Sequence, residues 1–134
     1  MPLLLDWNDF DQAVARIADQ CQREGLAGVY GVPRGGLPLA VALSHRLGLP
    51  LVTVIAPDVL VVDDIHDSGQ TLRELRQAHG ERLRHVWVWA TRESVPYGYQ
   101  AVLAAIGPSW VVFPWEAPAR AEADRQAYEV NHGH

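Results

Sequence analysis

The chain has 134 residues, of which 49% are hydrophobic, and its formal net charge is -5. This length is enough to bury one core, and the lack of clustered Lys and Arg argues against a nucleic-acid partner. No apolar run approaches membrane length, no secretory leader is evident, and the single cysteine, Cys21, cannot form an intramolecular disulfide. We therefore expect a cytoplasmic protein without nucleic-acid or membrane partners.

Apolar residues at helical spacing, bounded by capping residues, predict three helices. The first is expected to begin near Asp6 or Asn8 and to end at Gly25, and the next two are followed by Gly48 and Gly80. The predicted helices include Phe10–Cys21, Pro38–Leu47 and Thr71–His79. The polar, Ala-rich stretch 117–134 is expected to be a surface helix or a disordered tail, which leaves residues 1–116 as the domain.

Short runs of apolar, mostly β-branched residues alternate with these helices and predict the strands of a sheet. The predicted strands are Ala27–Val32, Val59–Val62, Val86–Ala90 and Trp110–Phe113. Alternating strands and helices are typical of an α/β fold, so we expect a single domain with a mainly parallel, twisted sheet flanked by helices. In such sheets ligands bind beyond the carboxyl ends of the strands.

The segment Leu51–Ile55 cannot be a full strand parallel to Val59–Val62. Only residues 56–58 separate the two segments, whereas a parallel return needs a crossover of about a dozen residues. We therefore expect Leu51–Ile55 to be antiparallel to its neighbour or not to form a complete strand.

The most informative run is Val59 to Leu72, which combines a buried strand, two carboxylates, a polar turn and the start of a helix. Unpaired N–H groups at the helix start favour a phosphate, and the hydroxyls of Ser68 and Thr71 add donors. Gly69 has no Cβ, so the backbone can approach a phosphate closely. The turn therefore predicts an anion site.

Asp63 and Asp64 follow one another at the end of this strand. Consecutive strand residues point to opposite faces, which does not suit a pair that shares one proton. Where the chain bends, both carboxylates can reach the vicinal hydroxyls of a ribose or a Mg²⁺ ion. The alternative is a strand end with two solvated Asp and a capping Ser, but the polar turn that follows favours a ribose-phosphate ligand.

Three segments resemble type I phosphoribosyltransferases, and they occur in the order found in that family. Residues 63–71 resemble the motif that binds phosphoribosyl pyrophosphate (PRPP), two acidic residues followed by D-[ST]-G-x-T. Residues 31–38 resemble the pyrophosphate loop, and residues 110–116 resemble the base-site segment of the xanthine-guanine, or 6-oxopurine, branch. A flavodoxin-like or receiver-type protein would also have an acidic pair, but not the Ser-Gly-x-Thr turn.

The resemblance implies a purine-salvage enzyme that transfers ribose 5-phosphate from PRPP to a purine base, with Mg²⁺. It assigns general base catalysis to Asp67, and ribose or metal binding to Asp63 and Asp64. The other implied contacts are the 5-phosphate with Ser68, Gly69, Gln70 and Thr71, the pyrophosphate with Arg34, Gly35 and Gly36, and the base with Trp110 and Arg92. An exposed turn residue at Arg34 and a core residue at Trp110 are the alternatives. We also expect a homo-oligomer.

Two features depart from the family pattern. Relatives carry a long flexible catalytic loop before the PRPP motif, whereas here only Pro57 and Asp58 separate Leu51–Ala56 from Val59. The family's base-reading lysine is missing too, since the chain contains no lysine, and Arg92 is the expected substitute. The missing loop favours a second hypothesis, a PRPP-binding or nucleotide-binding regulatory module with little or no transfer. The structure of 99–106 stays open, because Ala and Leu favour a helix and the resemblance a strand.

Overall fold

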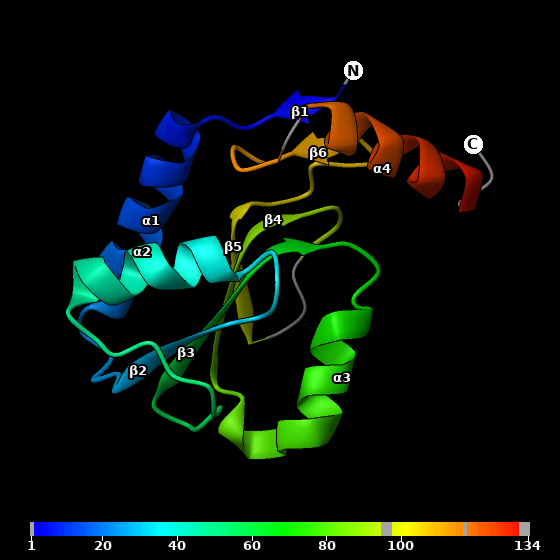
Figure 1. Cartoon of the computed structure of the whole chain (residues 1–134). Helices are drawn as coiled ribbons and strands as arrows, with labels where there is room; N and C mark the ends of the chain where they lie inside the picture. The colour runs from blue at the N-terminus through cyan, green and yellow to red at the C-terminus, as the bar shows by residue number, and fades with distance from the viewer. Residues whose placement is uncertain (1, 95–97, 117, 132–134) are drawn as a thin grey trace. The chain divides into compact units, whose positions relative to one another are not determined.

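The computed structural model describes residues 2–94, 98–116 and 118–131, and only the backbone of 118–123 and 131. The chain divides into two compact units, one formed by residues 12–107 and the other by residues 1–11 together with 108–134. The elements, shown in Figure 1, are β1 (Leu3–Leu4), α1 (Trp7–Cys21), β2 (Gly28–Gly31), α2 (Leu37–Leu47), β3 (Val59–His66), α3 (Gln70–His79), the 3₁₀ helix η1 (Gly80–Arg82), β4 (His85–Thr91), β5 (Tyr99–Leu103), β6 (Val111–Val112) and α4 (Pro118–Asn131). Within the described residues, every helix is too short or too polar to cross a bilayer.

The larger unit is built on a four-stranded sheet in the order β2-β3-β4-β5, with every neighbouring pair parallel. β2 ends where Gly31 pairs with Val62, whereas β4 accompanies β3 as far as His66, which pairs with Thr91. β3 therefore extends beyond β2 at its carboxyl end. The part of β3 beyond the end of β2 carries Asp63 and Asp64.

Helices flank this sheet, as the α/β prediction requires. Val59 and Val61 of β3 join Leu72 in one apolar cluster, and Leu75 of α3 packs against it. Strand alternation turns Leu60 and Val62 to the opposite face, and both are fully buried. Leu39 and Leu43, on the buried face of α2, are also fully buried, so apolar burial on both faces stabilises the unit.

The helix ends follow the capping signals in the sequence. The Asp6 N–H donates to Asp9 Oδ2 at 2.9 Å and the Asp9 N–H to Asp6 Oδ1 at 2.8 Å, a reciprocal cap that begins α1. α2 ends at Gly48, whose φ of 66° is left-handed, and α3 ends at Gly80. The predicted start of the first helix near Asp6 or Asn8 and the glycines that end the next two helices are confirmed, but α1 ends at Cys21 and not at the predicted Gly25.

Three expectations for the strands can be compared with the structure. Leu51 makes only an isolated parallel bridge to Val29, so the prediction that Leu51–Ile55 is not a complete strand is confirmed. β3 is longer than the predicted Val59–Val62, because β4 continues to pair beside it. Residues 99–103 form a strand, β5, which decides the question left open by their composition.

The smaller unit contains the parallel pair β1-β6 and helix α4. Trp7, Phe10, Phe113 and Trp115 form an aromatic cluster in which Phe113 stacks on Trp115 with ring centroids 5.2 Å apart. The backbone of 118–131 is helical, although Ala117, 132–134 and the Arg120 side chain lie outside the description.

Candidate active site

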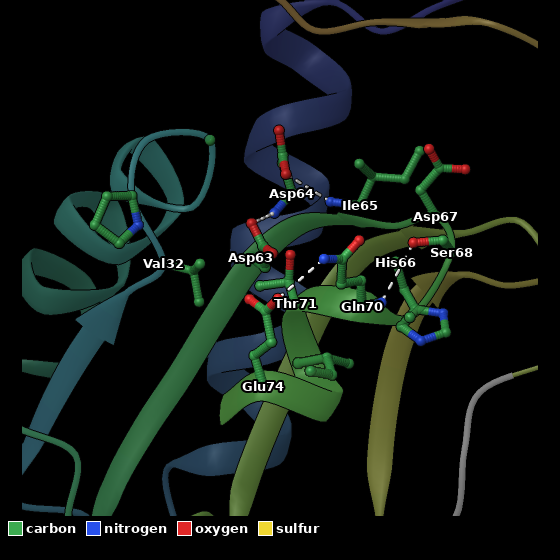
Figure 2. Close-up of a pocket in the computed structure, with 14 residues that line it drawn as sticks. Val32, Asp63, Asp64, Ile65, His66, Asp67, Ser68, Gln70, Thr71 and Glu74 are labelled. Atoms are coloured by element: carbon green, nitrogen blue, oxygen red, sulfur yellow. Dashed lines mark hydrogen bonds between the residues drawn. The ribbon is translucent and has the colours of Figure 1, made fainter. Parts of the chain in front are cut away.

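A pocket of about 440 Å³ lies in the larger unit, where the carboxyl end of β3 meets the start of α3. Its walls include all of residues 63–72, together with Val32, Pro33, Gly35 and Glu74. Figure 2 shows Asp63, Gln70 and Thr71 around the same space, with Val32 on one side and Ser68 and His66 on the other. The run that the sequence singled out thus forms most of one pocket.

Asp63 and Asp64 lie in the part of β3 that continues beyond its pairing with β2, and both line this pocket. The Asp64 N–H donates to Asp63 Oδ1 at 2.8 Å, and the Ile65 N–H donates to Asp64 Oδ1 at 2.8 Å. Each carboxylate is therefore fixed by the backbone amide of the next residue. Asp63 is buried and Asp64 half-buried, so the two side chains have different environments.

Burial, followed by the charge of the neighbouring Asp64 and a side-chain hydrogen bond with it, raises the pKa of Asp63 to about 8. Asp63 consequently holds a proton near neutral pH unless a cation or a hydrogen-bond donor favours its ionised form. Two carboxylates are the donor type that Mg²⁺ prefers. Among the described residues no three Asp, Glu, His or Cys side chains converge on a common metal position.

Residues 67–69 form the turn between β3 and α3, and Gln70 and Thr71 begin the helix. Gly69 is the N-cap of α3 with a φ of 82°, a conformation that glycine adopts without strain. Ser68 Oγ accepts a hydrogen bond from the Gln70 N–H at 3.3 Å, and Ser68 and Thr71 are exposed. The open helix start and its hydroxyls are suited to an anion.

The loop of Arg34, Gly35 and Gly36 lies against the same strand end, after a cis peptide bond between Pro33 and Arg34. A Cβ on Gly35 would overlap the Asp64 carboxylate, and a Cβ on Gly36 would overlap the Val62 carbonyl oxygen. Both glycines are therefore required for the close approach. Gly35 lines the pocket, whereas Gly36 is buried beneath it and Arg34 is exposed outside its walls.

His66 ends β3 and is held from β4. Its Nδ1 lies 3.2 Å from Thr91 Oγ1, and that hydroxyl donates to the Glu93 carbonyl oxygen at 3.0 Å. Because the Thr91 hydrogen is used there, neutral His66 must carry its own proton on Nδ1. Burial lowers the pKa of His66, and the Arg73 guanidinium lowers it further.

Asp67 is joined to Arg92, the residue after β4. Arg92 Nε donates to Asp67 Oδ1 at 2.6 Å, and Arg92 Nη1 donates to the Gly107 carbonyl oxygen at 3.1 Å. The Arg92 side chain is 10% exposed and that of Asp67 40%. Two residues expected at the base site are thus paired with each other, although Arg92 does not line the pocket.

Trp110 belongs to the smaller unit and packs on Tyr128 of α4, with ring centroids 5.0 Å apart. Its Nε1 is buried and has no hydrogen-bond partner among the described residues, while the side chain as a whole is half-buried. Packing therefore uses part of this ring, and the remaining surface is available for another contact.

Sequence reasoning missed two side chains next to the turn. Glu74 lines the pocket and accepts a hydrogen bond from Gln70 Nε2 at 3.0 Å, and Arg73 Nη1 donates to the Ser68 carbonyl oxygen at 3.1 Å. The available signal was helical periodicity, since residue 74 lies one turn after residue 70. Cys21, by contrast, is buried in the core, where burial raises the pKa of its thiol to about 12.

No family model matches the chain, but comparison with individual proteins finds similar phosphoribosyltransferases. A xanthine-guanine phosphoribosyltransferase from Chromohalobacter salexigens is 24% identical over 134 aligned residues, which cover 84% of this chain and 82% of the relative. The purine phosphoribosyltransferase from Pyrococcus horikoshii has a TM-score of 0.71 at 28% identity and is matched over 94% of its length by 87% of this chain.

A further solved structure agrees in fold. The xanthine-guanine-hypoxanthine phosphoribosyltransferase of Helicobacter pylori has a TM-score of 0.69 at 22% identity, with 92% of this chain and 99% of that chain covered. These solved structures agree with the parallel sheet flanked by helices. The chain is therefore similar to purine phosphoribosyltransferases, among them enzymes named xanthine-guanine phosphoribosyltransferase.

Proposed function

We propose that this protein transfers ribose 5-phosphate from PRPP to a purine base and releases pyrophosphate, a reaction of nucleotide salvage. The observation that carries the proposal is the pocket at the end of β3, which combines two carboxylates with an open helix start. The names of the relatives support the same reaction class. The partners are then small molecules. The proposal also includes a cytoplasmic location and assembly into a homo-oligomer.

In this proposal the turn after β3 holds the 5-phosphate. The N–H groups at residues 68–71 and the hydroxyls of Ser68 and Thr71 supply donors, and the α3 dipole favours the negative charge. Asp63 and Asp64 bind the ribose hydroxyls or a Mg²⁺ ion that takes most of its oxygens from the substrate. Such an ion would neutralise phosphate charge.

The pyrophosphate is assigned to the loop of Arg34, Gly35 and Gly36. The glycines bring the loop backbone close to Asp64, and the exposed Arg34 is available to a leaving group. The reaction breaks the bond between ribose C1 and a pyrophosphate oxygen and forms a bond from C1 to a base nitrogen. Asp67 is assigned the proton that the base nitrogen loses, and Trp110 is assigned to stacking on the base.

One observation favours a second candidate, a PRPP-binding or nucleotide-binding regulatory module. The connection from α2 to β3, residues 48–58, is fully described and closes in a turn in which the Val59 N–H donates to the Ala56 carbonyl oxygen at 3.0 Å. It contains no long loop that could cover a ribosyl centre. Exclusion of water is needed if a base rather than water is to capture that centre.

Incubation with PRPP, Mg²⁺ and a panel of purine bases, followed by phosphorus NMR, separates the two candidates. The proposed enzyme converts PRPP and a base into pyrophosphate and a nucleoside monophosphate. If PRPP binds but no base yields nucleotide, the regulatory module is the correct assignment. If PRPP does not bind at all, both candidates are wrong.

A further inference from the structure

Arg92 connects three segments of the larger unit. Its side chain donates from Nε to Asp67 Oδ1 and from Nη1 to the Gly107 carbonyl oxygen. Its backbone N–H donates to the His66 carbonyl oxygen at 3.2 Å, and its carbonyl oxygen accepts from the Gly107 N–H at 3.0 Å. The end of β4, the turn after β3 and the chain after β5 are therefore tied together at one residue.

These contacts fix the Arg92 side chain in place, so it is not free to turn toward a ligand. A guanidinium that is nine-tenths buried must keep its donors satisfied, because an unpaired buried cation is strongly disfavoured. If the Arg92 side chain turned toward a base, its hydrogen bonds to Asp67 and to the Gly107 carbonyl oxygen would both break. The short contact to Asp67 is charge-assisted, which makes it the stronger of the two.

We propose that Arg92 is a positioning residue for Asp67 and that it does not read the base. It holds Oδ1 of Asp67 and thereby orients the second carboxylate oxygen, Oδ2, which is the one a substrate can use. The proposal rests on the proposed transferase function, in which Asp67 accepts the base proton. Recognition of the base then depends on groups other than the Arg92 guanidinium.

Steady-state kinetics of Arg92→Met test this assignment, with PRPP and a purine base varied separately. Loss of positioning lowers kcat at least tenfold and leaves the KM for the base within about threefold, because an interaction needed in the transition state is lost without loss of base binding. Arg92→Lys keeps a cation beside Asp67 and should recover most of kcat. A base KM that rises tenfold in either variant while kcat is retained would overturn the proposal.

A double-mutant cycle with Asp67→Asn separates positioning from general damage. If Arg92 acts through Asp67, Arg92→Met lowers kcat less than threefold in the Asp67→Asn background. If the double variant loses kcat by the product of the two single losses, the proposal is wrong. Arg82→Met is the matched control, since the exposed Arg82 also donates to backbone carbonyls, at the far end of α3. Its kcat and KM should stay within twofold of wild type. If Arg92→Met does not fold, Arg92→Lys carries the kinetic test alone.

The proposed transferase function is tested separately on the wild-type protein. If that proposal is wrong, the wild-type protein binds PRPP without forming nucleotide. In that case amide hydrogen exchange still tests the positioning role. Exchange of the residue 92 and Gly107 amides, which donate to the His66 and residue 92 carbonyl oxygens, should accelerate at least tenfold in Arg92→Met and remain unchanged in Arg82→Met. Unchanged exchange in Arg92→Met would overturn the proposal.

Discussion

Two segments of this chain resemble family motifs, but their side chains are used in different ways. In residues 63–71 the polar groups face a pocket, and local backbone geometry fixes them, as the amide contacts of Asp63 and Asp64 show. In residues 110–116 the aromatic rings pack on each other and on neighbouring elements, with Trp110 against Tyr128 and Phe113 against Trp115. Local backbone contacts hold the side chains of the first segment in place, and packing between rings holds those of the second.

This difference separates what a substitution should change. A residue whose place is set by a local turn can be altered with a large effect on ligand binding and a small effect on the core. A residue whose ring also packs on another element should affect stability and binding together. The predictions below use that distinction, and each has a control at a comparable position without the proposed role.

The largest effect is expected in the turn after β3. Gly69→Val places a β-branched residue at a φ of 82°, with its Cβ 3.0 Å from Arg73 Nη1 and His66 Nε2, and Asp64→Asn removes a charged acceptor. Each should weaken PRPP binding at least tenfold, or about 1.4 kcal/mol, in calorimetric titration with Mg²⁺. Gly80→Val is the control, because it strains a glycine of positive φ at the other end of α3 and should leave affinity unchanged. Equal PRPP affinities in all variants would mean that the turn has only a structural role.

The next effect concerns the contact between the Arg34 loop and β3. Gly35→Ala inserts a methyl group into the space of the Asp64 carboxylate and should displace it, which weakens PRPP binding between about five- and tenfold. Gly28→Ala is the control, because its Cβ would crowd the Val52 side chain at the start of β2 instead. If both variants lose only stability, the Gly35 contact is not part of the site.

Trp110 should show both kinds of effect. Trp110→Leu removes a ring assigned to the base and also its contact with Tyr128, so nucleotide affinity should fall about fivefold, or ~1 kcal/mol, together with a lower Tm. Tyr128→Leu removes the packing partner alone and should lower Tm while affinity stays within twofold. A Trp110→Leu variant with lower Tm and unaltered affinity would assign the ring to packing.

The smallest effect is the pH dependence of stability at Asp63. Its pKa is raised to about 8 in the folded state from an ordinary value of 3.8, so the folded protein binds the proton more tightly. The free-energy penalty for burying this carboxyl therefore grows as the pH rises from about 4 to about 8, and it stays constant at higher pH. Asp63→Asn keeps the oxygen that accepts the Asp64 N–H but cannot ionise.

Measured without Mg²⁺, the Tm of Asp63→Asn should exceed that of wild type by a few degrees at pH 8.5, and the difference should shrink toward pH 4. Asp19→Asn, at an exposed position, is the control for the chemical change itself. A Tm difference that does not vary with pH would mean that Asp63 is not a strained acid in the folded state.

Much of the fold could be read from local patterns. The cap at Asp6, the glycines that end α2 and α3, and the incomplete strand at Leu51 each follow from a few neighbouring residues. The full length of β3 could not be predicted, because it depends on how far β4 runs beside it. Residues 99–103 form a strand despite their Ala and Leu, since pairing with β4 overrides their weak intrinsic preference.

The same limit applies to the site. The segment 67–71 is local, and the sequence was sufficient to predict its residues as one group, which the pocket brings together with Asp63 and Asp64. The pair between Arg92 and Asp67 joins residues 25 positions apart in the sequence, so only the structure shows that these two side chains meet. The assignments of base, phosphate and metal contacts to individual residues stay predictions.

The central claim is that the turn after β3 holds the 5-phosphate of PRPP. Calorimetric titration of PRPP with Mg²⁺, repeated with ribose 5-phosphate already present, tests it most directly. The account predicts one site, competition by ribose 5-phosphate but not by ribose, and loss of that competition in Gly69→Val. PRPP binding that ribose 5-phosphate does not reduce, or that Gly69→Val leaves intact, would contradict it.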